Sequence, residues 1–359
     1  MASHKCLWTI NSLYVEKTAL GYKASPCCLW DEEITPSVEK IEELQNNPFT
    51  DSVRKRFKKG WKRPQCQECV VKEDLGQTSK RQRSLKRSNN GKIVDWDIRP
   101  GNTCNLKCIM CNPFNSSKWM EDEEIWLKYG GSSSYQGDMK AREKLDWDWI
   151  YENCIDSAER IYIAGGEPFY MKSVRNFLER LSTHEWNRKN TRIVVQTNSI
   201  SNTPKLIDTL SKYKRLEFGI SIDGWAEVNE LIRFPTKHDV FLQNCTQLLN
   251  LSSKFSFFNI TVQALNLLDV DRTVTELGAR WPHVLIDKHL LVRPSQLSIN
   301  SLKPHVIEQA KNTTDEMLLK FLDTYEYNPK KNERMKNFLI EMDERRGTDS
   351  KKTLPWCFE

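Results

Sequence analysis

The sequence predicts an α/β fold, because short β-rich runs recur along the middle of the chain and segments suited to helices lie between them. Alternation of this kind indicates parallel strands that are joined by right-handed crossovers. Six such runs favour an open, partial (β/α)6 barrel of TIM-like architecture over a closed barrel of eight strands. The expected strands cover residues 93–98, 160–165, 192–197, 216–223, 258–265 and 284–292.

Two further regions flank this predicted barrel. Residues 1–90 are rich in cysteine and end in a polar, basic stretch typical of a linker, which predicts a small N-terminal auxiliary domain. The barrel is then expected over residues 91–300. The pattern beyond it is helical and charged, which predicts a helical C-terminal extension over residues 301–359.

The composition is that of a soluble globular protein, with 38% hydrophobic and 28% charged residues in a chain of 359. No run approaches the roughly 20 consecutive apolar residues that a membrane span requires, and the first residues lack the apolar core of a secretory signal. We therefore expect a cytoplasmic protein that does not contact a membrane. A reducing compartment directs the eleven cysteines toward metal binding or catalysis rather than disulfides.

Positive charge is concentrated in one segment. Residues 54–87 hold thirteen Lys and Arg against three acids, a local charge of +10, so the rest of a chain with net charge +6 sums to −4. Such a segment is suited to binding phosphates or an acidic partner, and it is equally suited to being a solvated face.

The loops that follow parallel strands line one mouth of a barrel, where ligands bind. Cys104, Cys108 and Cys111 follow the first expected strand. A structural zinc site is closed by four ligands, and an ordinary four-iron cluster has a cysteine on each iron. Three thiols on one short loop would leave one iron without a protein ligand, which is an open position for chemistry.

The spacing CxxxCxxC after the first strand of a partial barrel resembles the radical S-adenosylmethionine (radical SAM) enzymes. The resemblance implies a 4Fe-4S cluster whose open iron is chelated by the amino and carboxylate groups of SAM. An electron from the reduced cluster cleaves SAM to a 5'-deoxyadenosyl radical, which removes a hydrogen atom from the substrate. The spacing alone also fits a zinc loop.

Further residues match the SAM-facing motifs of this family. Gly165 and Gly166 allow close approach of the backbone to a ligand, and Glu167 would hold the amino group of SAM. Thr197 and Asn198 follow the third strand and also fit a simple strand-end turn.

The remaining matches concern the other groups of SAM. Ser221 and Asp223, two apart on an expected strand, project to the same side and would engage a sugar diol or polar backbone of SAM. Arg233 would reach its carboxylate. Met110 and Val292 are expected near the adenine.

A second group of cysteines precedes the barrel. Cys66 and Cys69 have a metal-chelating CxxC spacing, and with Cys6 and either Cys27 or Cys28 they would supply four ligands. This segment resembles the twitch or SPASM-type auxiliary domain of radical SAM enzymes, although it precedes the barrel instead of following it. The sequence leaves three alternatives for what these cysteines bind: a second 4Fe-4S cluster, a zinc ion or no metal.

These observations predict an enzyme that abstracts hydrogen from a peptide or protein side chain, because radical SAM enzymes with auxiliary domains often modify peptides. An electron donor such as flavodoxin or ferredoxin is then expected. One alternative is radical modification of a small molecule or of a nucleic acid bound by residues 54–87. Another is a noncatalytic iron-sulfur or zinc scaffold or redox sensor.

Overall fold

The computed structural model describes residues 6–18, 20–25, 27, 36–59, 66, 69, 70, 73, 78–85, 92–130, 145–252 and 255–359. The chain divides into two compact units, which are described separately. The first unit comprises Met1–Asn102, Gln136–Val195 and Asp208–Leu216, and the second comprises Thr103–Tyr135, Gln196–Ile207 and Glu217–Glu359. The expected domain boundaries near residues 90 and 300 remain predictions.

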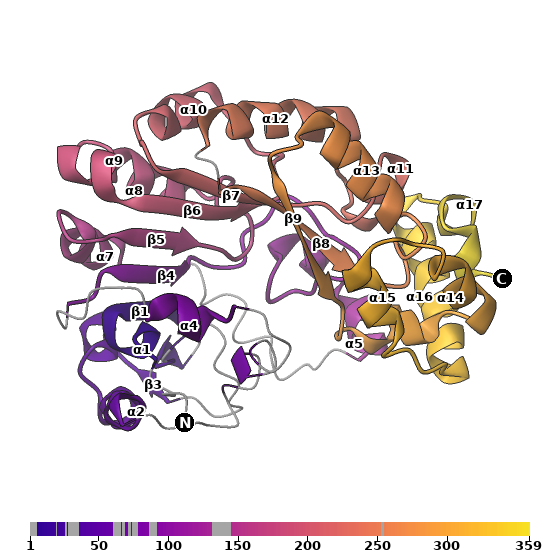
Figure 1. The fold of residues 1–359 in the computed structure, drawn as a ribbon, viewed down its shortest axis with the longest axis horizontal. Coiled ribbons are helices and arrows are strands. Elements are labelled where there is room, and N and C mark those ends of the chain that lie inside the picture. Colours follow the sequence, from indigo (N-terminus) through magenta and orange to yellow (C-terminus); the bar gives the residue numbers. More distant parts are fainter. Residues whose placement is uncertain are drawn as a thin grey trace. The chain divides into compact units, whose positions relative to one another are not determined.

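The first unit is built on a sheet with the strand order β3-β2-β1-β4-β5-β6 (Figure 1). Strands β1, β4, β5 and β6 are parallel, whereas β2 and β3 add an antiparallel edge. The strands are β1 (Ser12–Thr18), β2 (Gly21–Lys23), β3 (Ser37–Val38), β4 (Asp95–Arg99), β5 (Arg160–Ile163) and β6 (Arg192–Thr197). The apolar side chains of β5 and β6 are largely buried, as is usual for parallel strands covered on both faces.

Strand β1 has no counterpart among the strands expected from the sequence. It pairs in parallel with β4, and Leu13 lies opposite Trp96 in this register. Leu13 and Val15 are buried while Tyr14 is partly exposed, so only alternate residues of the strand carry a clear apolar signal. The cysteine-rich N-terminal region therefore contributes a strand to the same sheet as β4.

The helices of the first unit form because their apolar residues recur at helical spacing. In α8, Val174, Phe177, Leu178 and Leu181 are buried along one face. The helices are α1 (Trp8–Asn11), α2 (Pro48–Lys58), α4 (Lys80–Ser84), α7 (Trp147–Cys154), α8 (Lys172–Leu181) and α9 (Glu185–Asn190), with a 3-10 turn η1 (Ile41–Leu44).

The second unit contains three parallel strands in the order β7-β8-β9. They are β7 (Leu216–Ser221, of which the first residue belongs to the first unit), β8 (Phe257–Val262) and β9 (Leu285–Leu290). All six strands expected from the sequence are thus present, with ends shifted by a few residues. The mostly parallel sheet with intervening helices confirms the predicted α/β fold.

Helices make up most of the rest of the second unit. They are α5 (Glu123–Lys128), α11 (Glu227–Ile232), α12 (His238–Leu251), α13 (Val270–Arg280), α14 (Pro304–Ala310), α15 (Glu316–Leu322), α16 (Pro329–Arg346) and α17 (Ser350–Thr353). Helix α10 (Pro204–Ser211) is divided between the units. The 3-10 turns are η3 (Ser117–Asp122), η5 (Ser295–Leu297), η6 (Ile299–Ser301) and η7 (Pro355–Cys357).

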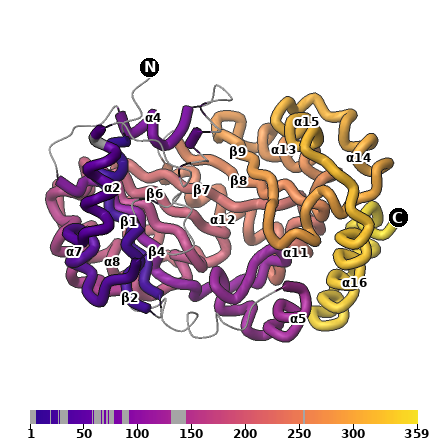
Figure 2. Tube along the Cα trace, turned by 90° about the horizontal axis from the view of Figure 1, so that it is seen from below, coloured from indigo at the N-terminus to yellow at the C-terminus, as the bar shows by residue number. Residues whose placement is uncertain are grey.

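The chain after residue 300 is helical, and both views show α14, α15 and α16 grouped near the C-terminus (Figure 2). Helix α16 begins at the cap Asn328, whose side chain accepts a hydrogen bond from the Lys331 N–H, and ends at Gly347 in the left-handed conformation. The last residues anchor on the segment that follows β8, where Trp356 Nε1 donates to the Ala264 carbonyl at 3.0 Å.

Candidate active site

The cysteine loop follows β4 and belongs to the second unit. Cys104 and Cys108 are buried with Leu106, and Met110 and Cys111 pack against this group. The loop therefore brings the three thiols into one largely buried cluster.

Main-chain hydrogen bonds fix the backbone between these cysteines. The Lys107 N–H donates to the Phe234 carbonyl at 2.8 Å, and the Ile109 N–H donates to the Ile232 carbonyl at 2.7 Å. Both acceptors lie at or just beyond the end of α11. Since more than 100 residues of sequence separate donors from acceptors, this conformation depends on the folded unit and not on the loop alone.

The segment after the loop holds it from another side. The Cys104 N–H donates to Ser117 Oγ at 3.2 Å, and Trp119 Nε1 donates to the Cys108 carbonyl at 2.8 Å. Trp119 is almost fully buried, and its indole N–H finds a partner as a buried donor requires. The positions of two of the three cysteines are thus coupled to turn η3.

A buried ion pair accompanies the thiols. Arg233 Nη1 lies 2.6 Å from Asp223 Oδ2, while Asp223 Oδ1 accepts a hydrogen bond from the Thr261 N–H at 2.7 Å. Burial raises the pKa of the Cys108 thiol, and the nearby Arg233 guanidinium opposes that rise. Arg233 therefore supplies positive charge where thiolates would need it.

The structure corrects the expected placement of Asp223. Strand β7 ends at Ser221, so the two residues do not lie on one strand, and Asp223 stands in the loop beyond it. Because both carboxylate oxygens already accept hydrogen bonds from the protein, Asp223 is arranged to orient Arg233. Ser221 is partly exposed at the end of the strand.

Asn198 lies beside the first cysteine. Its side-chain Nδ2 donates to Asn105 Oδ1 at 2.8 Å and is 4.0 Å from Cys104 Sγ. Thr197 is buried, and its Oγ1 accepts a hydrogen bond from the Ser199 N–H at 3.0 Å. Thr197 and Asn198 therefore form the expected turn at the end of the strand. The same turn places the Asn198 side-chain amide beside the thiol cluster.

A second buried ion pair lies next to the loop, and no motif in the sequence indicated it. Arg346, in the last turn of α16, donates from Nε and Nη2 to Asp122 Oδ2 at 2.9 and 2.8 Å, and the exposed fractions of the two side chains are 1% and 0%. The guanidinium also lies over Trp119, 5.0 Å from the ring centre, and Lys107 reaches Asp122 Oδ1 at 3.3 Å. The C-terminal helix thus helps to position the cysteine loop.

The Gly-Gly-Glu motif lies in the first unit, directly after β5. Gly165 and Gly166 have φ angles of 120° and 51°, which L side chains rarely adopt, and a Cβ on Gly165 would meet the Gly101 carbonyl oxygen at 3.2 Å. Glu167 is fully buried and accepts a hydrogen bond from the Phe169 N–H at 3.0 Å. The backbone therefore requires glycine at residue 165 and favours it at residue 166.

The donor chemistry of the loop fits an iron-sulfur cluster. No group of three or more His, Cys, Asp or Glu side chains in the described ranges is arranged around a single metal ion. A mononuclear site needs ligands that converge on one point at about 2.3 Å, whereas a four-iron cluster takes each thiolate on a different iron. The pKa of Cys111 is raised by burial and, to a smaller degree, by Cys108 and Cys104, and Arg233 and Arg346 lie close by. Three neighbouring thiols with cations beside them fit the second requirement.

The N-terminal thiols gather within the first unit. Cys6 is buried with Trp8 and Phe57, and Cys27 and Cys66 pack against this group. Burial raises the pKa of Cys6, and the neighbouring Cys69 raises it further. Four of the five candidate ligands therefore lie in one neighbourhood.

The fifth candidate, Cys28, lies outside the described residues. A cation accompanies the other four: the pKa of Arg81 is raised by its hydrogen bond to Glu73 and, to a smaller degree, by Cys6 and Cys69. This resembles the pairing of Arg233 with the loop thiols.

Three other expectations concern exposed or partly described parts of the chain. Val292 is 73% exposed, just beyond β9. The basic segment 54–87 is described only in part, at residues 54–59, 66, 69, 70, 73 and 78–85. Among the helices of the described chain, none has the length and apolar character to cross a membrane.

Comparisons with solved structures gave remote matches. The chain is 15% identical to a histidine-tagged anSMEcpe with bound AdoMet, with a TM-score of 0.41, over 69% of this chain and 58% of that one. It is 13% identical to SuiB of Streptococcus suis, whose structure has bound precursor peptide SuiA, with a TM-score of 0.38, over 90% of this chain and 58% of that one. The chain thus spans less than two thirds of the length of these proteins.

A comparison with curated proteins gave no match. The family model "Radical SAM superfamily" matches residues 98–277, which is half of the chain. The matched range runs from β4 to α13 and contains the three cysteines, the Gly-Gly-Glu motif and the Asp223–Arg233 pair. The predicted family is therefore confirmed, and this chain belongs to the radical SAM superfamily.

Proposed function

We propose that this protein reductively cleaves S-adenosylmethionine at a 4Fe-4S cluster held by Cys104, Cys108 and Cys111, and that the resulting radical abstracts hydrogen from a peptide or protein side chain. The cluster, when bound, supplies the electron that cleaves the sulfonium bond. The products of that cleavage are methionine and a 5'-deoxyadenosyl radical, which becomes 5'-deoxyadenosine when it takes the substrate hydrogen.

One observation carries this proposal: three clustered thiols share a buried site with the Asp223–Arg233 pair. Thiolates in a buried site need nearby positive charge, and Arg233 provides it. An arginine fixed by a buried carboxylate is also suited to binding the carboxylate of an amino acid such as the methionine part of SAM.

The other residues have supporting roles. Glu167 would accept hydrogen bonds from the SAM amino group beside the open turn of Gly165 and Gly166. Met110 and Val292 would contact the adenine, Asn198 would keep its amide next to Cys104, and Ser221 would contact the ribose. Burial of the thiols excludes water from the radical chemistry.

A second cluster in the N-terminal region is part of the proposal. Cys6, Cys66, Cys69 and either Cys27 or Cys28 would close its coordination, so we assign it to electron relay or to shaping the substrate site. A zinc ion is the other candidate for this thiol set. The external electron donor would be a small redox protein such as flavodoxin or ferredoxin, in the cytoplasm.

Electron paramagnetic resonance of the reconstituted, dithionite-reduced protein tests the proposal. We expect the spectrum of the reduced cluster to change when SAM is added, because SAM binds the open iron. The same change should persist when Cys66 and Cys69 are both replaced by Ala, and it should be absent when the three loop cysteines are replaced. If the reduced protein contains iron but its spectrum does not change when SAM is added, the scaffold or redox-sensor alternative is favoured.

A further inference from the structure

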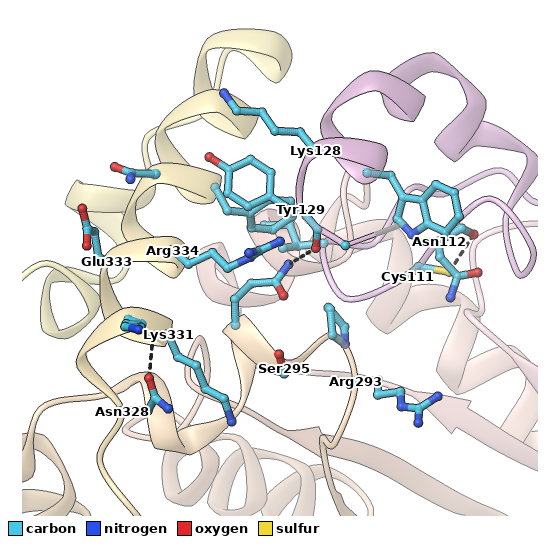
Figure 3. A pocket seen from close by; sticks show the side chains of 18 of the residues that line it. Cys111, Asn112, Lys128, Tyr129, Arg293, Ser295, Asn328, Lys331, Glu333 and Arg334 are labelled. Atoms are coloured by element: carbon cyan, nitrogen blue, oxygen red, sulfur yellow. Dashed lines mark hydrogen bonds between the residues drawn. The ribbon is translucent and has the colours of Figure 1, made fainter. Parts of the chain in front are cut away.

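A cavity lined by residues of the second unit opens beside the cysteine loop. It has a volume of about 970 Å³, which is the size of a typical ligand pocket. Cys111 and Asn112 lie at one side of it, and α16 forms the opposite wall (Figure 3). A molecule bound in this cavity would therefore lie next to the proposed cluster.

The wall formed by α16 and the segment after β9 is cationic. Arg293, Lys330, Lys331 and Arg334 line the cavity, against the single carboxylate of Glu333. No carboxylate in the described part of the chain forms an ion pair with any of the four cations, whereas many exposed Lys and Arg elsewhere do have such partners. Among the described lining residues, four cations that form no ion pair, against the one carboxylate of Glu333, indicate an anionic ligand.

Two other lining residues, Lys128 and Tyr129, already bind a carboxylate that belongs to α16. Lys128 Nζ lies 2.6 Å from Glu341 Oε1, and the Tyr129 hydroxyl donates to the same oxygen at 2.7 Å. Glu341 belongs to α16, two turns beyond Arg334. An ammonium and a phenol together thus satisfy one glutamate at the rim of the cavity.

The aromatic residues argue against a nucleic acid as the ligand. Single-stranded nucleic acids are bound by stacking bases on aromatic faces. Tyr129 already packs edge to face with Phe338, at 5.0 Å between ring centres, and Arg334 lies over its ring at 5.6 Å. Trp126 packs in the same way against Phe114 at 5.5 Å. Both rings thus already make contacts within the protein, which argues against their use for stacking bases.

We propose that this cavity binds an acidic peptide segment, so that the substrate carries Asp or Glu next to the residue that is modified. The proposal rests on the peptide-modifying function proposed above, and it names the substrate class of that site. Arg334 and Lys331 are the principal contacts, because Figure 3 shows both side chains directed into the cavity while Glu333 points away from it.

Fluorescence anisotropy of the full-length protein tests this directly, and it requires no turnover. The probes are a fluorescein-labelled peptide of alternating Glu and Ala, a matched peptide of Lys and Ala, and a thymidine oligonucleotide of the same length. We expect the acidic peptide to bind, and the double variant Lys331→Glu, Arg334→Glu to bind it at least about tenfold more weakly, since two charge-assisted contacts are lost.

Two further variants make the result specific. Lys330→Glu with Lys331→Glu leaves the Arg334–Tyr129 contact intact and should also weaken binding of the acidic peptide. Lys351→Ala with Lys352→Ala removes two exposed charges from α17, outside the cavity, and should leave binding unchanged. Equal losses in all three variants, or absence of acidic-peptide binding, would overturn the proposal.

The oligonucleotide decides the remaining alternative. If it binds more tightly than the acidic peptide and loses its affinity in the same cavity variants, the cavity binds nucleic acid and the proposal is wrong. Because peptide binding is measured without SAM, its failure is distinguishable from failure of SAM to bind the cluster, which the spectroscopy above reports separately.

Discussion

The two groups of cysteines reach similar surroundings by different routes. Cys104, Cys108 and Cys111 come from a single stretch of eight residues, whereas Cys6, Cys27, Cys66 and Cys69 are spread over more than sixty. Both groups are partly buried and both have an arginine close by, Arg233 in one case and Arg81 in the other.

The difference lies in what surrounds the thiols. The main chain and side chains of the second unit bind the loop at several points, and two buried ion pairs accompany it. The N-terminal group packs mainly against apolar side chains, Trp8, Val53 and Phe57. We interpret the loop cysteines as a site that must hold, in fixed geometry, an iron with one free coordination position and the ligand that fills it. We interpret the N-terminal cysteines as a site in which thiols fill every coordination position, so that apolar packing is sufficient to hold it.

The largest expected effect concerns the ion pair beside the loop. Replacing Arg346 by Ala leaves Asp122 buried with only Lys107 and the more distant Arg345, and breaking such a pair typically costs about 3 kcal/mol. Urea unfolding should show this loss. The variant should also release the iron of the loop cysteines at a lower urea concentration than the iron of the N-terminal cysteines.

Arg345→Ala is the matched control for this prediction. Arg345 is adjacent in sequence but about half exposed, and it lies 3.5 Å from the same carboxylate. An exposed pair is worth about 0–1 kcal/mol. If both variants lose equal stability, the buried Arg346–Asp122 pair does not have the role assigned to it.

A smaller effect is expected at Glu167. Glu167→Ala should weaken SAM binding by about tenfold, as expected for the loss of one charge-assisted hydrogen bond, while the iron content and cluster absorbance are retained. Equilibrium binding of labelled SAM measures the change. Glu167→Gln, which keeps an oxygen for the Phe169 N–H, separates loss of charge from damage to the turn. Loss of iron in both variants would place Glu167 in cluster binding instead.

The smallest change is expected in the N-terminal group. Replacing Cys66 and Cys69 by Ala should lower the iron content to about half if each group holds one four-iron cluster, and the cluster of the loop should still respond to SAM. Metal analysis of the purified protein measures this. Unchanged iron together with lost zinc would identify the N-terminal site as a zinc site.

The features that depend on local pattern could be predicted from the sequence. The loop cysteines are close together in the chain, and the six central strands are short β-rich runs between segments suited to helices, so both could be recognised without a structure. Strand β1 was missed because its polar residues alternate with only two buried apolar ones and it pairs with a partner 83 residues away, as in Ser12 with Asp95.

Residues that act through distant partners could not be predicted. Arg346 lies 224 positions from Asp122, and nothing in the basic end of α16 distinguishes it from the exposed Arg345. The cavity lined by Arg334 likewise needs α16 to pack beside the segment after the cysteine loop. In each case tertiary packing, and not spacing along the chain, creates the site.

The central claim is that the loop thiols, and not the N-terminal ones, perform the SAM chemistry. The most direct measurement is the yield of 5'-deoxyadenosine, by chromatography, after anaerobic reconstitution with iron and sulfide, reduction and addition of SAM. We expect the product from the wild type and from the Cys66→Ala, Cys69→Ala variant, and none when Cys104, Cys108 and Cys111 are replaced by Ala. Undiminished product from the variant without the loop cysteines would contradict the account.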